Sequence, residues 1–328
     1  MRIARWALAR IGSALLVVWV VTTIVFFALR ASGDPLEAIL GGPGSQAGPE
    51  AVARARETYG LDQPLVWQYL LLLGRVGTLQ LGDSYARRQP VAELVAAQLP
   101  STLLLATLAL VLAWTLALLG AVIAQTARGS VGRAVAAALR GAEVVATVTP
   151  QFWLGAVLIL VFAASLGVLP ATSNGTDPAG LVLPVITLAI PIAGFLAQVM
   201  RDALGEADAA PFATTARSRG ASESRVLLRH TLRHASLPAL ALSGWAYGSL
   251  LSGAVIVETL FARPGLGRLL IDGALQRDVP IVIGAVVVVA LVYIAVMVVG
   301  DALELLVDPR LRHRGRTAPR PADVAVGS

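Results

Sequence analysis

Cysteine and lysine are both absent from this chain of 328 residues, and charged side chains are scarce at 14%. The lack of cysteine excludes disulfide bonds, thiolate metal sites and cysteine nucleophiles. Soluble domains usually carry about a quarter charged residues, whereas hydrophobic residues make up 56% of this chain and its mean hydropathy is +0.75. The composition therefore indicates a membrane protein.

The sequence motifs of common nucleotide-binding and hydrolytic enzymes are also missing. There is no GxxxxGK[ST] phosphate loop, no HExxH and no GxSxG, so we expect the chain to bind no ATP itself and to be neither a protease nor a hydrolase. His230 and His234 have the i, i+4 spacing of a metal-binding pair, but a solvated helix face explains them better because no further ligands accompany them. We expect no catalytic residue, no metal site and no bound cofactor.

Long hydrophobic runs dominate what is present. Each is about the 20 residues that a helix needs to cross the hydrocarbon core, and helices satisfy their own backbone hydrogen bonds in lipid. The six runs are Ile11–Leu29, Ser101–Ile123, Gln151–Leu169, Leu181–Met200, Ala239–Val257 and Ile281–Gly300. A weaker run, Ala136–Val148, either begins the third span or lies at the interface. The sequence thus predicts an all-α, polytopic membrane protein with six transmembrane helices.

The distribution of arginine predicts the orientation of these spans. Arginines gather in the N-terminal ten residues, between the second and third spans, between the fourth and fifth, and after residue 309, whereas the loop 170–180 has none. Because positive charge favours the cytoplasmic side, we expect both termini and the loop 201–238 to be cytoplasmic. This topology also explains the net charge of +6 without a nucleic-acid partner.

The runs divide the chain into four expected parts. Residues 1–30 form the cytoplasmic N-terminus and first span, and residues 31–100 form an external amphipathic segment. Within that segment we expect short helices at Ala51–Tyr59 and Leu65–Leu73 and a flexible loop at Gly41–Gly48. Residues 101–310 form the transmembrane core, and residues 311–328 form a disordered basic tail.

A polar, arginine-rich hairpin of two short helices, residues 211–238, interrupts the hydrophobic core. Pro211 can open the first helix, Gly220 can end it in a left-handed conformation, and Ser222 can cap the second. Arg225, Arg229 and Arg233 then recur every fourth residue and form one basic face. By charge alone this hairpin is typical of an interfacial element that touches anionic lipid. A DNA-binding helix-turn-helix is unfavoured because the hairpin is held between two spans.

The order of residues in the hairpin is more specific than its charge. It reads Thr214-Thr215-Ala216-Arg217-Ser218-Arg219-Gly220-Ala221-Ser222, then Leu227-Leu228-Arg229-His230 and Leu237-Pro238. These runs resemble the coupling motif of the dipeptide/oligopeptide/nickel permease family, whose B-type subunit is the closer match. Thr214, Ser218 and Arg219 depart from the usual RTARAKG, whereas Gly220 is retained. Shorter landmarks in family order and spacing include Gly33-Asp34-Pro35, Pro150-Gln151-Phe152-Trp153-Leu154-Gly155, Val257-Glu258-Thr259-Leu260-Phe261, Pro264-Gly265-Leu266-Gly267 and Asp308-Pro309-Arg310.

The resemblance implies a type I ABC importer permease fold and a permease subunit of the bacterial cytoplasmic (inner) membrane. Its implied partners are a second homologous permease subunit of the C type, two ATP-binding subunits that would hold ATP and Mg, an external substrate-binding protein, and membrane lipid. The implied cargo is di- and oligopeptides, with nickel or a metal chelate as the alternative. A non-transporting membrane scaffold, whose basic loop binds lipid or another protein, is the alternative from a different class.

The resemblance also assigns roles to residues. It implies that the loop 201–238 couples the permease to the ATPase, and the residues expected to do so are Thr214, Thr215, Ala216, Arg217, Arg219, Gly220, Arg225, Arg229, His230 and Pro238. It further implies that the end of the fifth span approaches an external gate, with Glu258, Phe261, Gly265 and Gly267 as the candidate residues. The alternative for Glu258 is an interfacial acid at the external surface that pairs with Arg263.

Overall fold

The computed structural model describes residues 2–40, 47–174 and 177–307. Every named element in these residues is a helix. The elements are α1 (Arg2–Ser32), α2 (Leu36–Ile39), α3 (Pro49–Thr58), α4 (Leu65–Gly77), α5 (Val91–Thr126), α6 (Gly129–Val148), α7 (Gln151–Leu158), η1 (Ile159–Ser165), α8 (Ala179–Ala209), α9 (Pro211–Ser218), α10 (Glu223–Val226), η2 (Leu227–Thr231), α11 (Leu232–Ala241), α12 (Ser243–Leu260), α13 (Leu266–Leu275) and α14 (Val279–Val307).

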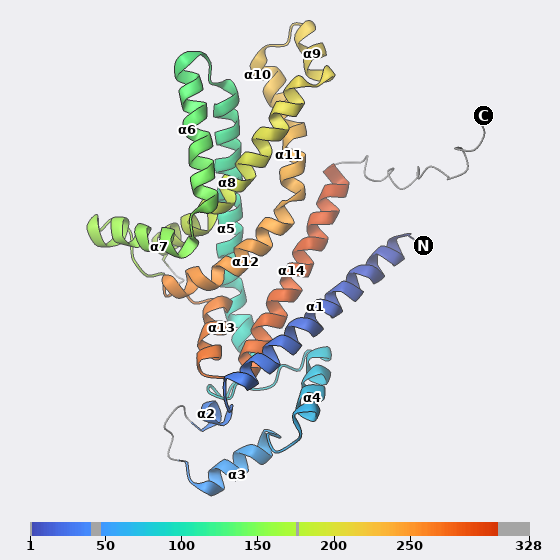
Figure 1. Cartoon of the computed structure of the whole chain (residues 1–328), viewed down its shortest axis with the longest axis vertical. Helices are drawn as coiled ribbons and strands as arrows, with labels where there is room; N and C mark the ends of the chain where they lie inside the picture. The colour runs from blue at the N-terminus through green and yellow to red at the C-terminus, as the bar shows by residue number, and fades with distance from the viewer. Residues whose placement is uncertain (1, 41–46, 175–176, 308–328) are drawn as a thin grey trace, which may run out of the picture.

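The centre of the molecule is a helix bundle in which α5 and α8 form the most extensive contact and α6 lies beside them (Figure 1). The face of α5 that packs in the core carries alanines three or four residues apart: Ala106, Ala109, Ala113, Ala117 and Ala121, all fully or almost fully buried. Small residues at such spacing let helix backbones approach closely, which is how helices associate where lipid supplies no hydrophobic drive.

Within residues 2–40, 47–174 and 177–307, membrane-crossing length is reached by four single helices and by two bent pairs, which gives six spans if each bent pair counts as one. The first bent pair corrects the expected third span, Gln151–Leu169. That segment holds only α7 and η1, ends its helix at Ser165, and turns by 107° from α6. Pro150 causes the turn, since it disfavours helical backbone at the preceding Thr149, which is extended with ψ 122°. In Figure 1, α7 projects sideways from the bundle.

Helices also extend beyond their apolar runs. α5 begins at Val91, ten residues before the expected Ser101, and α8 continues to Ala209, well past Met200. Hydropathy marks only the part of a helix suited to lipid, and the helical backbone of α5 continues through Pro100 within this extension. The fifth span is divided as well, because α11 and α12 meet at a 48° bend.

The segment after α1 folds against the C-terminal end of α1 and the N-terminal end of α14. This is the opposite end of the molecule from α9 and α10 (Figure 1). Phe26 of α1, Val76 of α4, and Val279 and Ile283 of α14 share one buried cluster. The expected helices at 51–59 and 65–73 are confirmed by α3 and α4. The expected loop lies largely at 41–46, and the expected tail lies at 311–328; both fall outside the described residues.

Candidate functional sites

The hairpin, residues 211–238, stands at the end of the bundle where α8 ends and α11 begins (Figure 1). Its turn is built as the sequence predicts. Pro211 begins α9, and Gly220 has a φ of +82° directly after the helix. The amide of Gly220 donates to the carbonyl of Arg217 (2.9 Å), and the amide of Ala221 donates to that of Ala216 (3.1 Å). These two bonds form a Schellman motif, which fixes the angle at which α10 leaves α9.

Arg217 connects the hairpin to the bundle. Its guanidinium forms ion pairs with Asp208, near the end of α8, and with Glu223, at the start of α10 (3.1 Å to Oε1). Hydrogen bonds to the Glu223 and Asp208 carboxylates raise the pKa of Arg217. The sequence motif did not identify Asp208 as a partner of Arg217. The position of Asp208, three residues before Pro211, could have indicated such an ion pair. Arg217 therefore acts within the chain as a brace, and its side chain is committed to these two acids.

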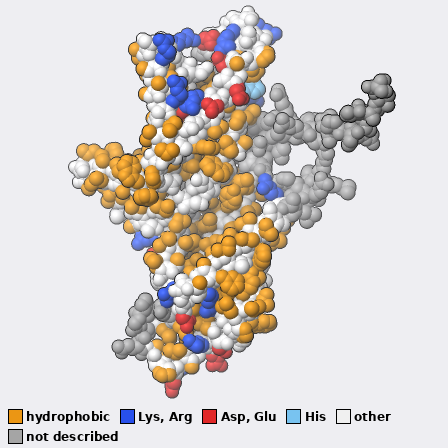
Figure 2. All heavy atoms as spheres, viewed as in Figure 1, with side chains coloured by type: hydrophobic (Ala, Val, Ile, Leu, Met, Phe, Trp, Pro, Cys, Tyr) orange, Lys and Arg blue, Asp and Glu red, His pale blue; other side chains and the backbone are white. Residues whose placement is uncertain are grey.

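Most other residues expected to couple are available to a partner. Thr214, Thr215, Arg219, Gly220, Arg225, Arg229 and Pro238 are exposed, and Ala216 and His230 are partly buried. Figure 2 shows blue and red side chains together at this end of the molecule, while orange ones cover the middle. The exposed surface is not only basic, because the side chain of Leu228 is 60% exposed beside Arg229.

The second helix of the hairpin is anchored by its opposite face. Val226, Leu227, Thr231 and Ala235 are buried. The predicted cap position of Ser222 is confirmed, but its hydroxyl makes no capping bond and lies 3.3 Å from the Ser224 hydroxyl. Residues Leu227–Thr231 form a π-helical turn, so the backbone departs from the ideal 3.6-residue period within the basic face. The hairpin thus presents a fixed surface of arginines and Leu228.

One histidine of the hairpin packs against an aromatic ring. The ring of His234 stacks near that of Phe212, with 4.6 Å between centroids. Within the described residues, no group of three or more His, Asp or Glu side chains is placed to hold a metal ion.

Glu258 lies at the other end of the bundle and is completely buried. Its carboxylate accepts hydrogen bonds from the Thr102 hydroxyl of α5 (2.6 Å), from the amide of Gly267 (2.8 Å) and from the amide of Arg268 (3.2 Å). The Thr102 oxygen in turn accepts from the amide of Leu266 (2.9 Å). Free amides at a helix N-terminus attract negative charge. We name this arrangement of Glu258, Thr102 and the first turn of α13 the latch.

The latch corrects one expectation. Glu258 is not an interfacial acid at the external surface, because its side chain has no exposure and caps α13. The sequence could not reveal this, since Thr102 is 156 residues from Glu258 along the chain and only the fold brings the two together. Arg263, expected as its ionic partner, donates its hydrogen bond to the Ser173 hydroxyl (2.7 Å). Burial lowers the pKa of Arg263, and the charge of Glu258 opposes this shift.

The other candidate gate residues lie around the latch. Phe261 is fully buried, and its carbonyl accepts from the amide of Ser173 (2.8 Å). A Cβ on Gly265 would overlap the Glu258 carboxylate, and one on Gly267 would overlap the backbone of Val255. The structure therefore brings Glu258, Gly265 and Gly267 together and gives a steric reason for both glycines.

A second buried carboxylate joins α6 to α8. Glu143 forms an ion pair with Arg201, and its Oε1 is buried with no hydrogen-bond partner in the part of the chain that the structure describes. Beside it, the Gln198 amide donates to the Thr147 hydroxyl (2.9 Å) and to the Glu143 carbonyl (3.3 Å). From the sequence, Arg201 contributed only to the predicted orientation of the spans. Its pairing with Glu143 could not be predicted, because the two residues are 58 positions apart.

Comparison with known proteins identifies the class. The family described as "Binding-protein-dependent transport system inner membrane component" matches residues 117–313, and the family of the corresponding N-terminal region matches residues 3–106. The chain therefore belongs to the family of inner membrane components of binding-protein-dependent transport systems. The resemblance drawn from the hairpin and the landmarks is confirmed at this level.

Individual relatives cover nearly the whole chain. A protein of Brucella abortus (strain 2308), whose name describes a peptide transport system permease, is 35% identical over 317 residues, 93% of this chain and 98% of its own. The di/tripeptide transport system permease protein DppB of Pseudomonas aeruginosa is 34% identical over 336 residues, with the same coverage. The oligopeptide transport system permease protein OppB of Haemophilus influenzae is 31% identical over 307 residues, also 93% and 98%.

Solved structures agree on the fold. The MetNI methionine ABC transporter, described in its inward-facing conformations, superposes with a TM-score of 0.57 and 15% identity over 67% of this chain and 98% of the matched chain. The expected ABC importer permease fold is thereby confirmed, and the chain is a multi-pass component of the inner membrane.

Proposed function

We propose that this chain is the permease subunit of an ATP-driven importer of di- and oligopeptides. The assignment of peptides as the cargo is supported by the similarity, along nearly the full length, to permeases whose names specify peptide, di/tripeptide and oligopeptide transport. The chain would act with a second, C-type permease subunit, two ATP-binding subunits and an external substrate-binding protein. ATP and Mg would be bound by the ATP-binding subunits, so this chain itself catalyses no reaction.

The hairpin is the proposed contact with an ATP-binding subunit. A short helix laid in a groove of a partner is a common mode of attachment, and the exposed arginines with Leu228 supply both charge and apolar contact. Closure of the ATP-binding subunits would then move the hairpin as a rigid body and, through α8 and α11, rock the transmembrane helices. The brace from Arg217 to Asp208 and Glu223 supports this role, because it ties the hairpin to the end of α8.

The topology follows from the same proposal. The hairpin, both termini and the basic tail 311–328 would be cytoplasmic, and the segment 31–100 would be external. The latch would then lie at the external end of the pathway, with Glu258, Phe261, Gly265 and Gly267 forming part of the gate. Glu258→Gln should impair uptake and leave assembly with the ATP-binding subunits intact; normal uptake by this variant would refute the gate assignment.

The test of the proposed function is uptake of radiolabelled di- and oligopeptides by cells that lack this chain. The wild-type chain should restore uptake, and Gly220→Val should not, because a β-branched residue resists the left-handed backbone at φ +82°. Gly205→Ala is the matched control, since it lies on α8 with nothing within 4 Å of the added methyl group. If cells lacking this chain take up peptides as well as wild-type cells do, the peptide cargo is refuted. If the chain instead restores uptake of nickel or a metal chelate to those cells, that cargo takes the place of peptides.

A further inference from the structure

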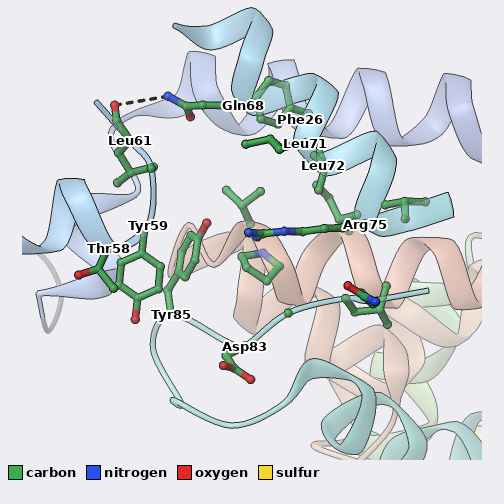
Figure 3. Close-up of a pocket in the computed structure, with 18 of the residues that line it drawn as sticks. Phe26, Thr58, Tyr59, Leu61, Gln68, Leu71, Leu72, Arg75, Asp83 and Tyr85 are labelled. Atoms are coloured by element: carbon green, nitrogen blue, oxygen red, sulfur yellow. Dashed lines mark hydrogen bonds between the residues drawn. The ribbon is translucent and has the colours of Figure 1, made fainter. Parts of the chain in front are cut away.

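A cavity of about 570 Å³ lies at the end of the molecule away from the hairpin, between α1, α4, the start of α14 and the chain around residues 80–85. Figure 3 shows its wall: Gln68, Leu71, Leu72 and Arg75 face it from successive turns of α4, and Tyr59 and Tyr85 close one side. This volume falls in the range of small-ligand sites. The latch, the hairpin and the Glu143–Arg201 pair do not use these residues.

The polar groups of the cavity carry both signs of charge. Arg30 and Arg75 line it, together with the exposed acids Glu57 and Asp83. Arg30 donates to the Gln68 side chain, yet its Nε is buried with no acceptor among the described residues. The guanidinium of Arg75 extends across the cavity toward Tyr85 (Figure 3). Burial raises the pKa of the Tyr85 phenol, and the charges of Arg30 and Arg75 oppose this shift. The cavity therefore holds a neutral hydroxyl within electrostatic reach of two arginines.

The helices around the cavity have the composition typical of elements at a membrane surface. The lipid-compatible span of α1 runs from Arg10 to Ser32, so Arg30 stands within its last turn. α4 turns a second face outward, where Val66 is 69% exposed, Trp67 53% and Leu70 50%. Exposed tryptophan and aliphatic side chains on a short amphipathic helix are typical of an element that lies in the interface. Leu71 belongs to both faces, because it lines the cavity and is 47% exposed.

We propose that this cavity binds the headgroup of a zwitterionic, ethanolamine-type phospholipid while the acyl chains lie along the exposed face of α4 and the neighbouring α1. Arg30 and Arg75 would hold the phosphate by charge-assisted hydrogen bonds, and Glu57 and Asp83 would receive the ammonium group. A dipeptide has similar charges, but it has no acyl chains that could cover the apolar face of α4 beside the cavity. The lipid site is independent of which cargo the permease carries.

Native mass spectrometry of the delipidated, detergent-solubilised chain, titrated with phosphatidylethanolamine, tests this site. Arg75→Gln should weaken binding about tenfold, as expected for one charge-assisted hydrogen bond. Arg54→Gln should have no effect, since Arg54 lies on α3 of the same external segment, is 77% exposed and does not line the cavity. Asp83→Asn should weaken phosphatidylethanolamine more than phosphatidylglycerol. Arg30→Gln should act like Arg75→Gln, but Arg75 is the more secure test because Arg30 also holds Gln68.

Three results would overturn the proposal. Equal affinity of wild type and Arg75→Gln for phosphatidylethanolamine would show that the lipid does not use the cavity. Displacement of the lipid by soluble phosphoethanolamine or inorganic phosphate at equal concentration would indicate a site for a soluble anion. If dialanine displaced the lipid from the wild type and bound less well to Arg75→Gln and Asp83→Asn, the cavity would be a peptide site.

Discussion

Removal of the Glu258 carboxylate should release the first turn of α13. In Glu258→Ala, three donors lose their acceptor: the hydroxyl of Thr102 and the amides of Gly267 and Arg268. Hydrogen bonds to a charged group contribute about 1.5–3 kcal/mol each. Counting only the two shorter bonds, which join fully buried partners, the loss is about 3–6 kcal/mol.

Glu258→Gln should be milder, and the reason lies in the geometry of the latch. The remaining amide oxygen can still accept from Gly267 and Arg268, while the new NH₂ group faces the Thr102 oxygen. That oxygen already accepts from Leu266, so the hydroxyl proton of Thr102 loses its acceptor. One unsatisfied buried group costs about 1–3 kcal/mol.

Hydrogen exchange measured by mass spectrometry on the purified protein separates these cases. If exchange of the peptide 264–275 reports opening of the latch, a loss of about 3 kcal/mol predicts exchange roughly 100-fold faster in Glu258→Ala. Peptides of the hairpin should be unchanged, because the hairpin lies at the other end of the bundle. Glu93→Ala, which removes an exposed acid from the first turn of α5, is the control. Unchanged exchange of 264–275 in Glu258→Ala would refute the latch.

Three further predictions concern the hairpin, the α6–α8 contact and the latch glycine. Arg217→Ala should make the hairpin more sensitive to limited proteolysis by freeing Asp208 and Glu223, whereas Arg229→Ala should weaken only co-purification of the ATP-binding subunit; equal effects of the two would contradict the brace. Arg201→Ala should destabilise the protein by about 3–5 kcal/mol, because it leaves the buried Glu143 unpaired. The loss should appear as a lower Tm, and adding Glu143→Gln to the same chain should partly restore the Tm. An unchanged Tm in Arg201→Ala would argue against the ion pair. Gly265→Ala should abolish uptake because its Cβ displaces the Glu258 carboxylate, while Gly74→Ala, with open space around it, should be neutral; full uptake by Gly265→Ala would count against the gate.

Local backbone chemistry could be predicted well from the sequence. Pro211 and Gly220 determine the ends of α9 through fixed φ and left-handed conformation, which are properties of single residues. The α3 and α4 helices follow from apolar spacing and the turn before Pro64. The family motif located the hairpin and its exposed arginines for the same reason, since contiguous residues carry it.

Contacts between distant residues could not be predicted in this way. Glu258 looked like an interfacial acid because hydropathy places it at the end of a span, and only the fold brings Thr102 and the amides of α13 around it. A proline such as Pro150 indicates a break in a helix, but the 107° angle of the turn depends on how α6 packs on α8. The lipid-type cavity joins residues from α1, α4 and α14, which no single sequence window contains.

Site-specific photocrosslinking of the hairpin in the assembled complex tests most directly whether the hairpin contacts an ATP-binding subunit. The chain has no native cysteine, so Leu228→Cys can carry a benzophenone label at a position that is 60% exposed on the hairpin. Leu275→Cys is the matched control, being 80% exposed at the end of α13. We expect an adduct between residue 228 and a subunit that contains a GxxxxGK[ST] phosphate loop, identified by mass spectrometry, and none from residue 275. Absence of that adduct, or its equal formation from residue 275, would contradict the assignment of the hairpin as the coupling element.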